Sequence, residues 1–417
     1  MHSATLDLEP SCIAFSPDTD DCFVVGTYHL HKLENTLVEA ASKSHETEKD
    51  SPNDPGDLNT QIRGGTVVLF TLDNDKPILR QTLDLGLGIL DIAFSHTIST
   101  SRPARLAIAA TSGTIAFTNL LAPSPAKPIA QLANLEIHQP FDPSVLVLDI
   151  VWRPTRPSEF AVSLSTGAVV LCSRRSEVIA EDEGVSLEPE SQLVFIETTI
   201  IFKHSLEAWT VAFGCDGRFT YSGGDDGVFA CLDAESREDG GGNDEEENLD
   251  VRKLWQDRKI HGAGVTAILP LFVEQDASGG AVGEVMLTGS YDDHVRVVLA
   301  PRQRGRRPTV LAQRNLDGGV WRLKVIEDGE IVQGRWIVLA SCMYAGVRII
   351  EVKQENGECK IGILAKFEGH KSMNYGSDVR PRKGNREVDS YEIVSTSFYD
   401  KLMCVWKFDQ KAEKDSC

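Results

Sequence analysis

The side chains best suited to chemistry lie in the second half of the chain, beside glycine-rich turns. Three are titratable and are candidate catalytic residues: His294, His370 and Asp378. Seven more carry aromatic rings or charges that could bind a substrate: Glu207, Trp209, Asp225, Tyr291, Trp321, Arg322 and Tyr375. His370 is favoured as the base over His294, because no turn aspartate of its own repeat is an obvious partner for it.

Compact catalytic signatures are absent from the sequence. There is no G-x-S-x-G nucleophile elbow and no H-E-x-x-H metal motif. The nine cysteines are scattered, form no CxxC pair and are interpreted as reduced core residues. We therefore predict no metal site and no cofactor, although the sequence leaves open whether a metal assists. It also leaves open whether a hydrolytic reaction would use a side-chain nucleophile or an activated water.

The elements that must position these residues are short strands, and the clearest unit runs from Leu206 to Asp233. An apolar strand from Trp209 to Phe213 is followed by a second strand from Arg218 to Ser222. After Asp226-Gly227, a third strand runs from Val228 to Leu232. This order of strands and turns is typical of a β-propeller blade.

The turn between the second and third strands recurs along the chain. Matching turns are Gly64-Gly65, Ser112-Gly113, Thr166-Gly167, Asp226-Gly227, Asp292-Asp293, Ala345-Gly346 and Asp400-Lys401. Their spacing, for example 66 residues from Gly227 to Asp293, exceeds the ~40–45 residues of a usual WD repeat, and we assign the excess to loops. The sequence predicts an all-β fold, a single seven-bladed WD40-type β-propeller over residues 1–417.

Two polar stretches and the chain ends complete this organisation. Loop insertions are expected at about residues 31–63 and 235–249, because their composition cannot bury a core. A propeller must close its ring, and the last repeat stops soon after its third strand, Leu402 to Phe408. We predict that Ala4 to Leu8 supplies the missing outer strand of that blade.

The propeller topology places the candidate residues around one mouth. The loops that enter the innermost strands and the turns between the second and third strands emerge on the same face. In ordinary WD repeats a loop histidine bonds a turn aspartate and holds the blade rigid. His204 with Asp226, and His261 with Asp292, are therefore predicted to be structural pairs.

Composition excludes several classes of function. With 62 acidic against 42 basic residues the formal charge is −20, which argues against nucleic acid as a partner. No apolar run approaches the ~20 residues that span a membrane, and the start resembles no signal peptide. A cytoplasmic monomer that does not bind membranes is expected.

Several motifs resemble the diphthine methylesterase family, also called diphthine methyltransferase. The runs that carry the resemblance belong to the fourth to seventh expected blades and are His204 to Trp209, Tyr221 to Gly227, Thr288 to His294, Gly318 to Leu323, Cys342 to Gly346, Tyr375 to Asp378 and Ser397 to Asp400. The resemblance implies an enzyme of diphthamide biosynthesis. It would remove the methyl ester from methylated diphthine on translation elongation factor 2, and so allow the final amidation.

The resemblance also implies what the site must bind. Diphthine carries a trimethylammonium group, which aromatic faces attract. The four rings, Trp209, Tyr291, Trp321 and Tyr375, are expected to form a cage for it with Asp225, and the backbone N–H groups of Gly223-Gly224 and Gly318-Gly319 could face an oxyanion. The partner would be the diphthine-bearing loop of elongation factor 2. The alternative function is a non-catalytic WD-repeat scaffold for protein assembly.

Overall fold

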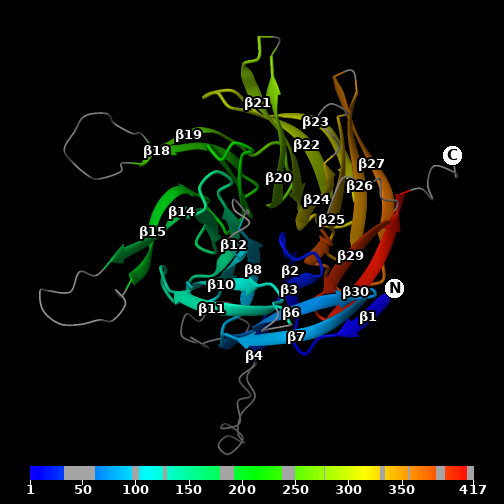
Figure 1. Ribbon diagram of the computed structural model, residues 1–417. Coiled ribbons are helices and arrows are strands. Elements are labelled where there is room, and N and C mark those ends of the chain that lie inside the picture. Colours follow the sequence, from blue (N-terminus) through cyan, green and yellow to red (C-terminus); the bar gives the residue numbers. More distant parts are fainter. Residues whose placement is uncertain are drawn as a thin grey trace, which may run out of the picture.

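Seven antiparallel sheets of four strands each surround a common centre (Figure 1). The computed structural model describes residues 1–31, 62–95, 103–124, 129–178, 192–236, 249–276, 278–328, 334–355, 357–381 and 390–410. The all-β, seven-bladed propeller predicted from the repeated turns is confirmed. In the described part of the chain, no helix has the length and apolar character needed to cross a membrane.

Each blade is built from four strands, ordered from the inner to the outer edge of the ring. Blades 1 to 3 are β2 (Pro10–Phe15), β3 (Cys22–Thr27), β6 (Thr66–Asp73) and β7 (Lys76–Asp84); β8 (Ile89–Phe94), β9 (Arg105–Ala110), β10 (Ile115–Leu121) and β11 (Gln131–His138); and β12 (Val147–Trp152), β13 (Glu159–Leu164), β14 (Ala168–Val178) and β15 (Gln192–Lys203). Blades 4 and 5 are β16 (Ala208–Phe213), β17 (Phe219–Gly224), β18 (Phe229–Ser236) and β19 (Leu249–Asp257); and β20 (Val265–Gln275), β21 (Ala281–Ser290), β22 (His294–Pro301) and β23 (Thr309–Asn315). Blades 6 and 7 are β24 (Arg322–Asp328), β25 (Arg335–Ser341), β26 (Val347–Glu355) and β27 (Glu358–Phe367); and β28 (Gly376–Val379), β29 (Ser390–Ser397), β30 (Leu402–Asp409) and β1 (His2–Thr5).

The N-terminal strand closes the ring, as predicted, but with different bounds. In Figure 1 the N-terminus lies beside β30, and the register pairs His2 with Val405 and Thr5 with Leu402. The strand is therefore His2–Thr5 rather than Ala4 to Leu8. The reason is that the chain must cross from the outer edge of blade 7 to the inner edge of blade 1, where β2 begins at Pro10. The residues between them are used for that crossing.

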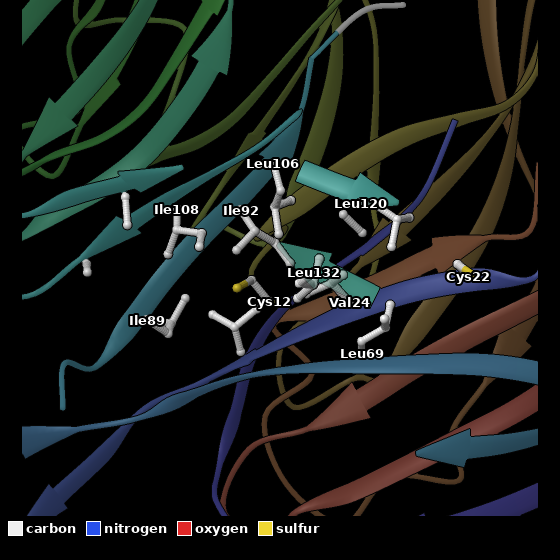
Figure 2. Packing of buried hydrophobic residues seen from close by; sticks show 14 of the residues in the cluster. Cys12, Cys22, Val24, Leu69, Ile89, Ile92, Leu106, Ile108, Leu120 and Leu132 are labelled. Carbon is white, nitrogen blue, oxygen red and sulfur yellow. The ribbon is translucent and has the colours of Figure 1, made fainter. Parts of the chain in front are cut away.

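The core lies between neighbouring blades (Figure 2). In the first two blades, Cys12, Val24 and Leu69 pack with Ile89 and other buried aliphatic side chains of blade 2. Gly26 allows this approach, because a Cβ there would lie only 2.7 Å from Cγ2 of Ile89. Gly223 plays the same part between blades 4 and 5, where a Cβ would lie 2.6 Å from Cγ1 of Val265. Close packing of this kind fixes each innermost strand against the next blade.

The two predicted insertions start from strand ends. The short strands β4 (His29–His31) and β5 (Ile62–Gly64) pair with each other at the ends of the first insertion. The second insertion connects β18 with β19 in blade 4. Residues 32–61 and 237–248 lie outside the described part of the chain, and so do the loop conformations expected there.

Candidate active site

Four aromatic rings from different blades meet at the mouth of the central channel. The ring of Trp321 lies 5.5 Å from Trp209, 5.9 Å from Tyr291 and 5.2 Å from Tyr375, measured between centroids. Trp209 and Tyr291 are also in edge contact at 6.2 Å. Beyond Tyr375 the contacts continue to Phe398, 5.6 Å away. We call Trp209, Tyr291, Trp321 and Tyr375 the aromatic cluster; Trp321 touches all three of the other rings.

Repeated local geometry positions these rings. The ladder between β16 and β17 shifts register between Ala208 and Thr210, so Trp209 sits at an irregularity where the innermost strand begins. Trp321 and Tyr375 occupy the residues just before β24 and β28. Bulges at strand ends redirect a side chain away from the sheet. Trp209, Trp321 and Tyr375 thus lie at the start of the innermost strands of blades 4, 6 and 7, whereas Tyr291 directly follows β21 in blade 5.

Carboxylates adjoin the aromatic cluster on one side. Trp209 Nε1 donates a hydrogen bond of 3.0 Å to Asp225, whose own backbone N–H donates to the carbonyl of Glu207. Burial raises the pKa of Tyr291, and the neighbouring Tyr375, Asp225 and Glu207 raise it further. The mouth is therefore both aromatic and electronegative, which suits an organic cation.

Charged side chains line the channel below the aromatic cluster. Arg322 Nη2 lies 2.9 Å from Asp91 Oδ1, and its Nη1 lies 3.2 Å from Asp149 Oδ1. Asp378 is buried, pairs with Lys324 Nζ at 2.7 Å and accepts the backbone N–H of Phe15 at 2.7 Å. One guanidinium thus connects blade 6 with blades 2 and 3, and a second ion pair connects blades 6 and 7.

A cavity of about 570 Å³ occupies this part of the channel. Its walls include Asp91, Arg322, Lys324, Tyr375 and Asp378. Tyr375 belongs both to this wall and to the aromatic cluster, so the cavity adjoins the rings. A bound cation at the mouth would therefore have polar, partly buried groups directly beneath it.

His370 lies in a different environment. Its Nε2 bonds Ser395 Oγ at 2.8 Å, and the same oxygen accepts Trp406 Nε1 at 3.0 Å. Phe367 stacks on Trp406 with centroids 4.6 Å apart and contacts the His370 ring by its edge. Burial lowers the pKa of His370 to about 4, with Asp400 as an opposing influence. This bonding resembles the structural histidine of a WD repeat, so the geometry supports a structural role more than a role as base.

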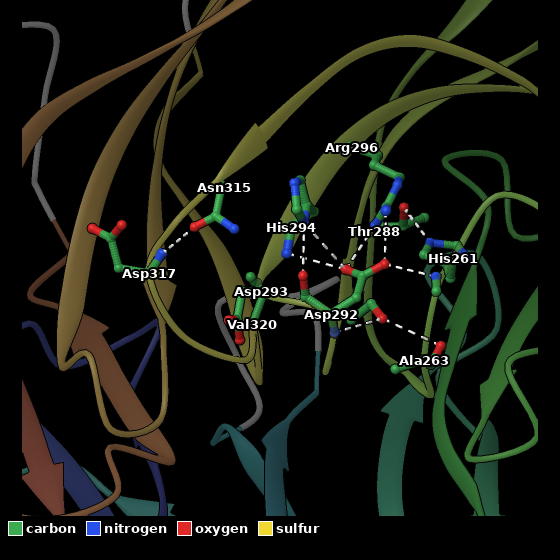
Figure 3. Close-up of polar contacts among 12 residues, drawn as sticks. His261, Ala263, Thr288, Asp292, Asp293, His294, Arg296, Asn315, Asp317 and Val320 are labelled. Carbon is green, nitrogen blue, oxygen red and sulfur yellow. Dashed lines mark hydrogen bonds and ion pairs between the residues drawn. The ribbon is translucent and has the colours of Figure 1, made fainter.

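His294 contacts the turn residue Asp292 (Figure 3). Its Nδ1 contacts the backbone oxygen of Asp292 at 2.6 Å, and its side chain borders a groove with Asn315, Asp317 and Lys366. Of the sequence-predicted catalytic residues, only Asp378 lines the channel cavity. Of the substrate-binding candidates, Arg322 and Tyr375 line that cavity. The four rings contact one another, and Asp225 accepts a hydrogen bond from one of them, Trp209.

The two predicted histidine–aspartate pairs have different outcomes. His204 bonds Asp226 at 3.0 Å and Ser222 at 3.0 Å, which confirms the first pair. The second expectation was wrong in detail: His261 bonds Thr288 at 2.9 Å, whereas the carboxylate of Asp292 accepts the Gly262 N–H and a bidentate contact from Arg296 (Figure 3). Arg296 is the competing donor that the sequence pattern did not reveal.

One expected oxyanion donor is already used. The N–H of Gly224 donates to the carbonyl of Val228 within the turn of blade 4.

Sequence reasoning also missed Asp91 and Asp149. The signal was present, because Leu-Asp-Ile occurs at the same position in the innermost strands Ile89–Phe94 and Val147–Trp152. A carboxylate inside an otherwise apolar strand needs a partner, and repetition in successive blades indicates a shared one. No group of three His, Cys, Asp or Glu side chains able to hold a metal occurs in the ranges that the structure describes.

We expect the protein to lose stability when the pH falls below neutrality. Burial lowers the pKa of His261 to about 3 and that of His370 to about 4, and it also lowers the pKa of His204. An unfolded histidine has a pKa near 6.5, so the unfolded chain binds more protons and folding weakens between about pH 6.5 and 4. Calorimetric melting between pH 7.5 and 4.5 tests this. His261→Gln should reduce the slope, and a melting temperature that stays constant down to pH 5 would contradict it.

The fold and mouth define a WD-type seven-bladed propeller with an aromatic, acidic opening above a charged channel. Two solved structures share the fold: a chain of the mitotic checkpoint complex (TM-score 0.52, 11% identity, 98% of each chain covered) and Sqt1 from Chaetomium thermophilum (TM-score 0.52, 12% identity, 93% of this chain and 79% of that chain covered). At these identities they indicate the fold alone.

Curated relatives point to a particular group of propellers. No family model matches the sequence. The protein named diphthine methyltransferase in Schizosaccharomyces pombe is 28% identical over 84% of this chain and 88% of its own length. Proteins with this name in Saccharomyces cerevisiae and Mus musculus are 25% and 28% identical, over 84% and 76% of this chain and 90% and 59% of their own lengths. The chain thus has homologues named diphthine methyltransferase over most of its length, and the resemblance noted in the sequence is confirmed.

Proposed function

We propose that this protein acts in diphthamide biosynthesis as an esterase. It hydrolyses the methyl ester of methylated diphthine on translation elongation factor 2 and leaves the carboxylate that the final amidation requires. The observation that carries the proposal is the aromatic cluster, which adjoins acidic residues and a polar cavity in a chain whose relatives are named diphthine methyltransferase.

The first requirement of this reaction is recognition of a quaternary ammonium group. Such a cation cannot donate a strong hydrogen bond, so a protein binds it through aromatic faces and nearby negative charge. The half-buried rings of Trp321, Trp209 and Tyr291 supply the faces, and Asp225 supplies the charge. A cation held there would contribute about 1–2 kcal/mol per well-placed ring.

The second requirement is a polar chamber next to the cation. In methylated diphthine the ester and the trimethylammonium are attached to the same carbon, so the ester carbonyl must lie within a few ångströms of the bound cation. The channel cavity begins at Tyr375 and Arg322, which is one residue from Trp321. The ester of a bound substrate would therefore face the charged groups of the channel.

The third requirement is access for a protein substrate. Leu206, Tyr344 and Tyr399 are exposed apolar or aromatic side chains in loops and turns of blades 4, 6 and 7. These loops are on the same face as the mouth, as the hydrogen bond of Tyr344 to Asp293 illustrates. We propose that the diphthine-bearing loop of elongation factor 2 approaches this face, in the cytoplasm, with the protein acting as a monomer.

The test is methanol release. Purified protein incubated with elongation factor 2 bearing methylated diphthine should release one methanol per modified factor, with a loss of about 14 mass units (one CH₂, counted from the formula of the ester). Factor that carries unmethylated diphthine is the control and should release none. If the protein binds the methylated factor tightly but releases no methanol, the proposal fails and a scaffold function is favoured.

A further inference from the structure

A three-residue ionic cluster lies in the channel. Asp91 comes from β8, Asp149 from β12 and Arg322 from β24, so blades on different sides of the ring contribute to it. The guanidinium contacts one oxygen of each carboxylate, at 2.9 and 3.2 Å. One positive charge is therefore shared between two acids.

The remaining carboxylate oxygens are held by the backbone. Asp91 Oδ2 accepts the N–H of Ile150 at 3.2 Å, and Asp149 Oδ2 accepts the N–H of Val211 at 2.9 Å. Each donor belongs to the next blade, so the innermost strands fix the direction of both carboxylates. Groups held in this way do not need to reorganise during a reaction.

The surroundings of Asp91 make its carboxylate more basic than that of an exposed aspartate. The residue is buried, with 8% of its surface exposed. Burial raises the pKa of Asp91 well above its ordinary value, Arg322 opposes the shift and the neighbouring Asp149 reinforces it. A carboxylate with a raised pKa is a stronger base than a free aspartate, and bases whose pKa approaches the working pH are the most effective.

The ionic cluster lies close to the place where the proposed substrate would bind. Asp91 and Arg322 both line the cavity that adjoins the aromatic cluster. Arg322 directly follows Trp321, and successive Cα atoms are about 3.8 Å apart. Because the ester and the quaternary ammonium of methylated diphthine share a carbon, a cation against Trp321 would bring the ester toward Arg322.

We infer that Asp91 and Arg322 are the catalytic residues of the esterase, and that Asp149 is a positioning residue that holds Arg322 and sets the basicity of Asp91. The inference rests on the proposed function and deepens it, because it assigns the chemical step to groups in the channel rather than to a histidine.

The reaction has a balanced course. A water molecule attacks the ester carbonyl while the ionised Asp91 takes one of its protons, and a carbon–oxygen bond forms. The negative charge on the former carbonyl oxygen is stabilised by the guanidinium of Arg322. When the tetrahedral species collapses, the bond to the methoxy oxygen breaks and Asp91 returns the proton, so that methanol leaves. The product is first the carboxylic acid, which keeps the second proton of the attacking water and then releases it to solvent, so that a carboxylate remains beside Arg322. The reaction consumes one water without any oxidation or reduction.

The alternative is that the ionic cluster of Asp91, Asp149 and Arg322 only stabilises the closed ring of blades. A matched control exists in Glu284, which is fully buried, accepts the N–H of Cys215 and the hydroxyl of Tyr221 from blade 4, and lies 3.4 Å from Arg302. It is also a carboxylate that connects two blades beside an arginine, but it does not line the channel cavity. Glu284→Gln therefore reports the effect of weakening such a brace.

The experiment compares Asp91→Asn, Asp149→Asn and Glu284→Gln with the unsubstituted protein, using methanol release from methylated elongation factor 2 below the melting temperature of each. Asp91→Asn should lower kcat by about 10²–10⁴-fold, the range for loss of a general base. Its affinity for glycine betaine, measured by tryptophan fluorescence, should be retained. Glu284→Gln should lower the melting temperature but keep kcat within about two-fold.

The pH profile separates chemistry from bracing. In the unsubstituted protein kcat/KM should fall on the acid side as Asp91 becomes protonated. Asp149→Asn removes the neighbouring negative charge, so the acid limb should move to lower pH. If the unsubstituted protein is active and Asp91→Asn matches its kcat, or the acid limb does not move in Asp149→Asn, the inference is overturned while the proposed function stands. If the unsubstituted protein releases no methanol, the proposed function itself has failed.

Discussion

Trp321→Ala should reduce the affinity for the methylated substrate by ~5–30-fold or more, which corresponds to about 1–2 kcal/mol for one desolvated cation–π contact. The effect should exceed that of substituting any other ring, because Trp321 is in contact with Trp209, Tyr291 and Tyr375. Its removal takes away one aromatic face and also the support of three others. Titration with glycine betaine, followed by kcat/KM on the methylated factor, measures both consequences.

Two controls isolate binding from folding. Trp321→Phe keeps a ring in the same place and should retain part of the affinity. Trp336→Phe changes a buried tryptophan that stacks on Phe272 at 5.0 Å, away from the mouth, and should leave the affinity unchanged. Equal affinity of Trp321→Ala and the unsubstituted protein would show that the cation binds elsewhere.

His370→Ala should destabilise blade 7 without removing catalysis. The substitution breaks the bond to Ser395, which also accepts Trp406 Nε1, and takes away the ring against which Phe367 packs. Loss of one partner of a buried hydrogen bond costs about 1–3 kcal/mol, and the cavity left by the ring adds to that cost. Denaturant unfolding should show a lower midpoint with an unchanged slope, and kcat should be preserved where the variant is folded.

His294→Ala is the comparison for this result. The His294 side chain is partly exposed and its polar contacts are with Asp292, its neighbour in the same turn, so its removal should change stability by less than about 1 kcal/mol. The opposite outcome would restore the interpretation drawn from the sequence: a fall in kcat of about 10²–10⁴-fold for His370→Ala, with unaltered unfolding, would identify His370 as the base.

Local patterns predicted the propeller because each blade is a short, nearly self-contained unit. Turns such as Asp226-Gly227 and Ala345-Gly346 require a left-handed residue, and Gly227 and Gly346 have φ of 70° and 77°. The resemblance and the repeat order together identified the aromatic cluster before any contact was known. Trp209, Trp321 and Tyr375 lie at the start of innermost strands, and Tyr291 lies in a turn between a second and a third strand, so knowledge of the topology was sufficient to bring them together.

The sequence by itself thus determined the seven blades, the closing N-terminal strand to within two residues at its start, and the aromatic mouth. Only the tertiary structure decided which charges meet inside the channel. Asp91, Asp149 and Arg322 are separated by up to 231 positions, counted from 91 to 322, and their contacts depend on the radius and curvature of the closed ring. It also decided the surroundings of His370, because its partner Ser395 belongs to a strand whose position is set by packing. The repeated sequence pattern indicates how each blade folds by itself, whereas contacts across the propeller exist only after all the blades have closed into a ring.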